Sequence, residues 1–337
     1  MNIRLTQIDG KLPNLALMKL AHWHKSKGDT IYFENSIVKN IFEPAYDIVY
    51  GSTIFSTSLK KVDLFKQNFP SAIIGGTGFD MSLKIENIIG CGDYEYENYD
   101  YSIYPNFTHS IGFTQRGCRL KCGFCVVPKK EGKQIMVNSI NDIWRGNGFE
   151  KKLHLLDNDF FGQELWQNRC DEIIQGKFKV CFNQGINVRL IHKESAEYLS
   201  KMQYMDDSFT KKRLYTAWDN RKDENIFMKG IDILCNAGVN PKNIMVYFLC
   251  GYWKGETFED IYYRFETMIK LGLMPYPMIY TDSNNYKELK RFQRWVIRRY
   301  YQFTTWEKFK YEKEKDYYNR INNENLSSFE PQLCLDL

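Results

Sequence analysis

Two runs of alternating strand-like and helix-like segments constrain the fold of this 337-residue chain more than any other feature. In the first run, short apolar segments typical of buried parallel strands alternate with segments whose apolar residues repeat at helical spacing. The expected strands are 3–8, 30–33, 47–50 and 72–74, and the expected helices are 15–27 and 59–69. This alternation predicts an α/β fold that begins with a doubly wound, Rossmann-like domain over residues 1–80.

The second run starts at Ser110, after a segment (81–107) rich in Asn, Asp, Tyr and Gly that we expect to be a linker. The expected strands are 110–114, 153–156, 179–182, 213–217, 244–249 and 277–280, and the expected helices are 161–174, 194–202, 224–237, 257–271 and 285–300. Six strand–helix units are too few for a closed eight-fold barrel, so residues 108–300 are predicted to form a partial (β/α)6 TIM-like barrel. Residues 301–337 are expected to form a helical and polar C-terminal tail.

The composition excludes several classes of protein. No apolar stretch approaches the roughly 18 residues that a membrane-spanning helix needs, and the first residues carry no apolar signal segment. The net charge of +5 is only mildly basic, below that of a dedicated nucleic-acid-binding domain. We therefore expect a cytoplasmic protein that makes no contact with a membrane.

Three of the nine cysteines lie within eight residues, and they carry most of the chemical information in the sequence. Cys118, Cys122 and Cys125 have the spacing C-x3-C-x2-C. Three thiolates on one short loop can hold three corners of a cubane iron–sulfur cluster and leave the fourth iron open to another ligand. The loop follows the first strand of the predicted barrel, and is therefore expected at the C-terminal mouth, where barrel enzymes carry out their chemistry.

The residues around these cysteines suit the same function. The cations Arg116, Arg119 and Lys121 favour thiolate over thiol, and they offset part of the negative charge of a cluster. Gly117 and Gly123 allow the loop to turn tightly. The other six cysteines are scattered among apolar neighbours, and are interpreted as reduced, buried side chains.

Two alternatives from other functional classes stay open at this point. One is a non-catalytic iron–sulfur protein that senses redox state or transfers electrons. The other is a zinc-binding nucleic-acid module, which would need a fourth Cys or His ligand. His109 and His154 are the nearest histidines in the sequence, and neither has the spacing of a ligand.

The motif, with Phe124 directly before its last cysteine, resembles the signature of radical S-adenosylmethionine (SAM) enzymes over roughly residues 100–300. This resemblance implies a [4Fe–4S] cluster whose open iron is chelated by the amino and carboxylate groups of SAM. Reductive cleavage of SAM would give a 5′-deoxyadenosyl radical that abstracts hydrogen from a substrate. It also implies a one-electron reductant of the flavodoxin or ferredoxin kind. The substrate is left open: modification or methylation of RNA, a peptide or a small molecule all agree with the sequence.

The same resemblance implies SAM contacts at the ends of the later strands. Where the family carries a Gly-Gly-Glu turn for the SAM amino group, this chain departs from the pattern and has Asp157, Asn158 and Asp159. Their oxygens are acceptors for an ammonium group, although an aspartate at this place also suits a helix cap.

Four further positions are matched to SAM one by one. Gln184 is expected to meet SAM or substrate, and Arg189 to pair with the SAM carboxylate, although a turn with a surface arginine is the simpler reading. Asp219 is expected to accept from the ribose hydroxyls, with a helix cap as its alternative. Gly251 is expected to let the backbone approach adenine. No residue is assigned to the catalysis itself.

The N-terminal domain is similar to that of the cobalamin-binding and methylthiotransferase branches of the family. Cobalamin is not favoured, because the loop after the first strand, Asp9-Gly10-Lys11, has no histidine to ligate cobalt. Its candidate contacts would be Ser52, Gly75 and Gly76; otherwise the domain serves as a scaffold. A second cluster is not supported, because Cys91 is the only cysteine that precedes the motif.

The segment from Arg291 to Tyr301 interleaves cations with aromatic rings. It suits either an RNA-facing helix or an amphipathic helix that packs its rings on the barrel and leaves its charges in water. The second interpretation is favoured, because glutamates dilute the basic residues that follow.

Overall fold

The computed structural model describes residues 1–311, which fold into two compact units that divide after Leu156. Both units are built from parallel strands and from helices, which confirms the predicted α/β class. The division lies further along the chain than the expected boundary at residue 108. None of the described helices is long and apolar enough to cross a membrane.

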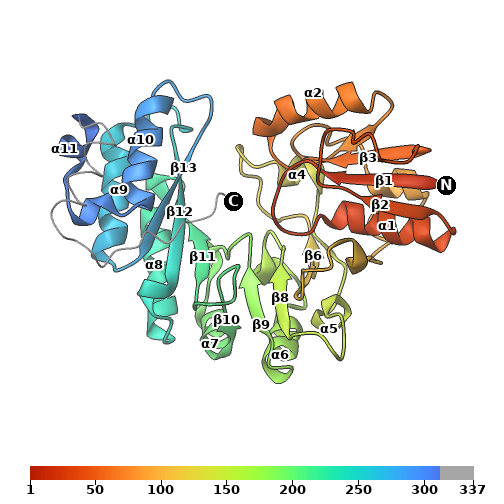
Figure 1. Ribbon diagram of the computed structural model, residues 1–337. Helices are drawn as coiled ribbons and strands as arrows, with labels where there is room; N and C mark the ends of the chain where they lie inside the picture. Colours follow the sequence, from red (N-terminus) through yellow and green to blue (C-terminus); the bar gives the residue numbers. More distant parts are fainter. Residues whose placement is uncertain (312–337) are drawn as a thin grey trace, which may run out of the picture. The chain divides into compact units, whose positions relative to one another are not determined.

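The first unit opens with a four-stranded parallel sheet (Figure 1). Its strands are β1 (Asn2–Gln7), β2 (Thr30–Phe33), β3 (Ile48–Ser52) and β4 (Ile73–Gly75), in the order β2-β1-β3-β4. Helices α1 (Leu15–Ser26) and α2 (Leu59–Asn68) cover opposite faces of the sheet. Because β2 and β3 flank β1, the strand order changes direction at β1, which is where open α/β sheets form crevices for ligands.

A cap and an apolar face explain how α1 is held on this sheet. The side-chain oxygen of Asn14 accepts the backbone N–H of Leu17 at 3.2 Å, which starts the helix. The amide nitrogen of Asn14 donates to Ser52 Oγ at 2.8 Å, which ties the start of the helix to the end of β3. Along the helix, the buried Leu17 and Leu20 pack in one cluster with Ile3 of β1.

Residues 81–107, expected to be a linker, are instead part of the first unit. They contain α3 (Ile85–Ile89) and a 3-10 turn (Tyr101–Ile103). Ile103 is buried in the same cluster as Ile3. The Tyr101 hydroxyl donates to the carbonyl oxygen of Ile111 and accepts the N–H of the same residue. The tyrosines and isoleucines of this segment give it an apolar surface to bury, which its polar composition concealed.

Two strand pairs complete the first unit. Strand β5 (Ser110–Gly112) pairs in parallel with β8 (Lys152–Leu155), and β6 (Gln115–Arg116) pairs antiparallel with β7 (Ile135–Met136). The short helices α4 (Val127–Lys130) and α5 (Ile140–Ile143) also belong to this part. The β6–β7 pair was not expected, because strands of two residues leave no periodic pattern. It brings the residues before the cysteine motif next to residues that follow it.

The second unit continues the alternation of strands and helices (Figure 1). Strand β9 (Lys179–Phe182) pairs with β10 (Gln203–Tyr204), and β11 (Leu214–Ala217), β12 (Ile244–Cys250) and β13 (Met274–Ile279) form a three-stranded parallel sheet. Between and after them lie α6 (Trp166–Gln175), α7 (Lys193–Lys201), α8 (Glu224–Asn236), α9 (Phe258–Lys270), α10 (Tyr286–Ile297) and α11 (Trp306–Tyr311).

The carboxyl ends of these strands gather the polar residues of the second unit. Strand β12 is central in its sheet, and every second side chain from Ile244 to Cys250 is buried. The segment after β9 lies along β11, because the N–H of Ile186 donates to the carbonyl oxygen of Tyr215 at 2.8 Å. Parallel strands end at the same edge, so the residues that follow β9, β11 and β12 lie near one another.

Helix α10 is amphipathic, as favoured from the sequence. Leu289, Phe292, Trp295 and Val296 are buried, whereas Arg294 and Arg298 are exposed. The rings therefore fill the interior and the charges lie in water. Of the expected C-terminal tail, residues 312–337 lie outside the described residues.

Candidate functional site

The three motif cysteines lie on one loop of the first unit, between β6 and α4. Each is partly buried and forms no disulfide bond. The N–H of Leu120 is directed at Cys118 Sγ at 3.4 Å, and the N–H of Cys125 donates to the carbonyl oxygen of Cys122 at 3.0 Å. The loop is thus a tight turn that carries all three sulfur atoms.

One carboxylate closes the base of this loop. Glu131 accepts the backbone N–H of Gly117 at 2.9 Å and the Arg116 guanidinium at 2.9 Å. Gly117 has a φ of 74°, and a Cβ atom there would lie 2.3 Å from the carbonyl oxygen of Lys133, so the position requires glycine. We call Arg116, Gly117 and Glu131 the loop clamp.

The loop clamp uses one of the cations that was expected to favour thiolates. The Arg116 guanidinium lies 3.9 Å from the centre of the Phe113 ring, and it shares its charge with Glu131. Arg119 and Lys121 are exposed on the loop itself. Arg116 therefore helps to shape the loop through Glu131. The exposed cations on the loop are Arg119 and Lys121.

The fit of an iron–sulfur cluster to this loop rests on the chemistry of the donors. Within residues 1–311, no group of three or more His, Cys, Asp and Glu side chains is arranged to hold a metal ion. Three thiols within eight residues are nevertheless the soft ligands that iron–sulfur clusters take, and Gly117 lets the chain bend sharply just before the first of them. The assignment of Cys118, Cys122 and Cys125 as cluster ligands stays a prediction.

A histidine pair near the motif was missed from the sequence. His109 Nδ1 lies 3.4 Å from His154 Nε2, and the two ring centres are 5.6 Å apart. His109 directly precedes β5 and His154 lies on its partner β8, so strand pairing brings them together over 45 residues. Such a pairing leaves no trace in local spacing.

The acidic residues that follow β8 are buried. Asp157 and Asp159 are 3% and 2% exposed, and Asn158 is partly exposed. Asp159 stands directly before a 3-10 turn (Phe160–Gly162), yet its side chain makes no capping hydrogen bond there. Capping therefore does not account for Asp159, and the three residues stay predicted contacts of the SAM amino group.

The residues after β9 differ in how firmly they are held. Gln184 is exposed. Arg189 donates to Asp223 at 3.0 Å and to Asn187 Oδ1 at 3.2 Å, and its side chain is 33% exposed. The protein thus supplies a carboxylate partner for Arg189, with which a SAM carboxylate would have to compete.

Asp219, at the end of β11, has one carboxylate oxygen fixed and one available. Its Oδ1 accepts the N–H of Leu249 at 3.0 Å, whereas its Oδ2 makes no hydrogen bond within residues 1–311. Burial raises the pKa of this carboxyl, outweighing the hydrogen bond from Leu249 and the charge of Arg264. The cap of the 3-10 turn that follows is Asn220, so the alternative role of Asp219 as a cap does not hold.

Gly251, at the end of β12, is required by packing within the second unit. Its φ is 84°, and a Cβ atom there would lie 2.4 Å from Ser283 Oγ. Its N–H donates to Glu256 Oε2 at 2.7 Å. These contacts within the protein are enough to require a glycine at this position. The approach of its backbone to adenine stays a prediction.

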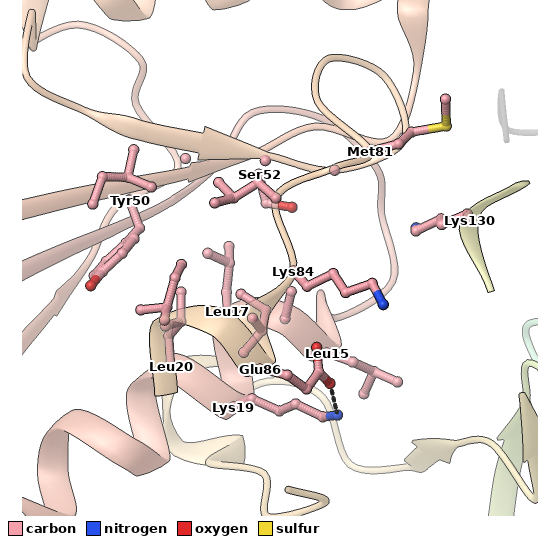
Figure 2. Close-up of a pocket in the computed structure, with 18 of the residues that line it drawn as sticks. Leu15, Leu17, Lys19, Leu20, Tyr50, Ser52, Met81, Lys84, Glu86 and Lys130 are labelled. Atoms are coloured by element: carbon pink, nitrogen blue, oxygen red, sulfur yellow. Dashed lines mark ion pairs between the residues drawn. The ribbon is translucent and has the colours of Figure 1, made fainter. Parts of the chain in front are cut away.

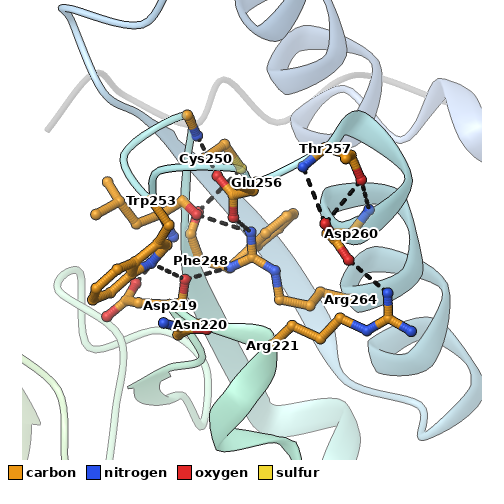
Figure 3. A network of polar contacts seen from close by, with 12 residues as sticks. Asp219, Asn220, Arg221, Phe248, Cys250, Trp253, Glu256, Thr257, Asp260 and Arg264 are labelled. Atoms are coloured by element: carbon orange, nitrogen blue, oxygen red, sulfur yellow. Dashed lines mark hydrogen bonds and ion pairs between the residues drawn. The ribbon is translucent and has the colours of Figure 1, made fainter.

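A buried arginine joins the ends of β11 and β12 (Figure 3). Arg264 of α9 is fully buried, and it donates to the carbonyl oxygens of Trp218, Asp219 and Leu249 at 3.0, 2.7 and 3.0 Å. It also pairs with Glu256. We call Asp219, Gly251, Glu256 and Arg264 the Arg264 network.

The sequence contained a signal for this network that was not used. Arg264 lies among the buried residues Ile261, Phe265 and Met268 of α9, at the spacing of one helix face. A cation within an apolar stripe must find partners inside the protein, because an unpaired buried charge is very costly.

The expected cobalamin contacts line a cavity in the first unit (Figure 2). Ser52, Gly75 and Gly76 lie on its wall, and its volume is about 160 Å³. Cavities near 150 Å³ hold a ligand the size of benzene. Cobalamin is many times larger than this cavity, so the cavity by itself would not hold it. In the loop after β1, Asp9 accepts from Thr53 Oγ1 at 2.6 Å.

No protein-family model matches the chain, and neither a curated protein nor a solved structure does.

Proposed function

We propose that this protein is a radical SAM enzyme whose [4Fe–4S] cluster is held by Cys118, Cys122 and Cys125. The observation that carries the proposal is the set of three cysteines, none in a disulfide bond, on one short loop with the spacing C-x3-C-x2-C. Three thiolates bind three of the four irons and leave one for another ligand. When bound, the cluster and SAM supply reductive SAM cleavage and hydrogen-atom abstraction.

In this proposal the chain itself shapes the cysteine loop and orients SAM. The loop clamp fixes the start of the loop through Gly117. In the second unit, the available oxygen of Asp219 would accept a ribose hydroxyl while its other oxygen stays on Leu249. Arg189 would bind a carboxylate, and the buried Asp157 and Asp159 would accept from an ammonium group.

The proposal extends to the type of α/β fold in each part of the chain. We infer that the sheet of residues 1–80 is Rossmann-like and that the later strands form a partial (β/α)6 barrel, because the helices alternate with parallel strands in both units. A one-electron reductant of the flavodoxin or ferredoxin kind would act on the enzyme in the cytoplasm. The substrate class, whether RNA, peptide or small molecule, is not assigned.

The test is anaerobic reconstitution with iron and sulfide. We expect about four irons and four sulfides per chain, and 5′-deoxyadenosine on addition of SAM and dithionite. Addition of SAM to the reduced protein should also change the electron paramagnetic resonance spectrum, because SAM binds the iron that has no cysteine.

The decisive variant is Cys122→Ala, with Cys91→Ala as its matched control in the same unit. Cys122→Ala should lose cluster iron and all SAM cleavage, and Cys91→Ala should keep both. A colourless protein with bound zinc would contradict the proposal in favour of the zinc-binding module. A stable cluster without SAM cleavage and without a spectral response to SAM would favour the electron carrier.

A further inference from the structure

The cavity of about 160 Å³ in the first unit lies beside the ends of β3 and β4 (Figure 2). Most of its wall is apolar and includes Leu15, Leu17 and Leu20 of α1 together with Leu83 and Ile85. Gly75 and Gly76 bring backbone to its edge. It is thus a small apolar chamber at the edge of a parallel sheet where ligands commonly bind.

Four basic side chains line this cavity, and three of them are neutralised. Lys19 pairs with Glu97 at 2.6 Å, Lys84 with Asp93 at 2.6 Å, and Arg116 with Glu131 at 2.9 Å. The fourth, Lys130, has no carboxylate within ion-pair distance among residues 1–311.

Lys130 is held by a neutral partner only. Its Nζ donates to Thr77 Oγ1 at 2.6 Å. Burial lowers the pKa of Lys130 and the neighbouring Arg116 cation lowers it further, while the Glu131 carboxylate offsets part of this shift. Figure 2 shows the amino groups of Lys84 and Lys130 on the same side of the cavity. The chamber therefore combines an apolar wall with one cation that an anion would stabilise.

We propose that this cavity binds a small carboxylic acid in its anionic form, with the carboxylate on Lys130 and an apolar body of about the size of a benzene ring against the leucines. A single cation that has no ion-paired carboxylate suits a monoanion better than a phosphate with two charges. The size follows from the volume, since a cavity near 150 Å³ takes benzene. This site needs neither the cluster nor SAM, so it stands apart from the proposed function.

The test uses benzoate and its neutral isostere benzamide as probes, with affinity measured by calorimetry and ligand-observed nuclear magnetic resonance on the full chain. Benzoate should bind about tenfold more tightly than benzamide, because its carboxylate can pair with the Lys130 cation. Lys130→Met should remove this preference and leave the weaker benzamide affinity unchanged. The control Lys60→Met, on the exposed side of α2, should keep the preference.

A second variant tests the chamber itself. Ala16→Leu, on the cavity wall, should weaken both probes because it fills the space that the ring needs, while thermal melting shows that the protein still folds. The proposal is overturned if benzoate does not bind at about 10 mM, if benzamide binds equally well, or if Lys130→Met keeps the preference for benzoate.

Discussion

The loop clamp of the first unit and the Arg264 network of the second are built from the same three parts. In each, one glutamate accepts the N–H of a glycine with positive φ and also pairs with an arginine. The glycines are Gly117 and Gly251, with φ of 74° and 84°. Both devices hold the start of a loop that follows a strand.

The two devices differ in burial and in loop length. The Arg264 side chain is fully buried and also binds three carbonyl oxygens, whereas the Arg116 side chain is 17% exposed and rests on Phe113. Gly251 and Glu256 are five residues apart, whereas Gly117 and Glu131 are 14 apart and enclose the cysteines. The buried device closes a short turn, and the more exposed one encloses the longer loop that carries the cysteines.

Removal of the buried arginine should have the largest effect. Arg264→Met leaves Glu256 buried without its partner, so we expect a loss of about 3–5 kcal/mol in the free energy of unfolding, measured by urea denaturation. Arg221→Met is the matched control, because Arg221 forms an ion pair at the surface with Asp260, which lies on α9 as Arg264 does. That variant should lose less than about 1 kcal/mol. Equal losses of unfolding free energy in the two variants would show that burial does not make the Arg264–Glu256 pair more important than the Arg221–Asp260 pair.

A smaller effect is expected at the loop clamp. Glu131→Ala removes the acceptor of the Gly117 N–H and the partner of Arg116, which should cost roughly 1–2 kcal/mol. Hydrogen exchange should speed up in residues 117–131 and stay unchanged at β12. Glu131→Gln, which keeps an acceptor for the Gly117 N–H, should restore most of the protection. Faster exchange throughout the unit in Glu131→Ala would contradict the local role of the clamp.

The smallest effect concerns the dependence of stability on pH. Because burial raises the pKa of Asp219 above its ordinary value of 3.8, the folded protein binds this proton more tightly than the unfolded chain. The contribution of this carboxyl to the free energy of unfolding should therefore decrease as pH rises from 3.8 through the raised pKa.

Asp219→Asn cannot ionise and still offers an oxygen to Leu249. Its free energy of unfolding relative to the native protein should increase as pH rises from 3.8 through the raised pKa, measured in urea titrations. The exposed Asp63→Asn on α2 serves as the control. A flat difference for Asp219→Asn would mean that Asp219 is not desolvated.

The sequence predicted the regular elements closely and the contacts between them poorly. In residues 1–80, each expected strand and helix is present with its bounds shifted by at most two residues, because the apolar periodicity is local. The segment 81–107 was misjudged, because Ile85 and Ile103 lie among polar residues and bury themselves only against a partner far along the chain.

The cysteine motif could be found from spacing alone, because its three residues share one loop. The partners of Glu131, Arg264 and Lys130 could not be found in this way. Each depends on groups that meet across many residues: Glu131 on Gly117, Arg264 on Asp219, and Lys130 on Thr77.

By itself, the amino-acid sequence determined the α/β class, the order of the longer strands and helices, and the set of three thiols, because these follow from periodicity and local spacing. The tertiary structure alone decided which charges are neutralised. Arg116 is neutralised by Glu131 and Arg264 by Glu256, whereas Lys130 has only Thr77 in the described part of the chain. The physical reason is that the state of a buried charge depends on what surrounds it in space, and a linear pattern does not contain those distances.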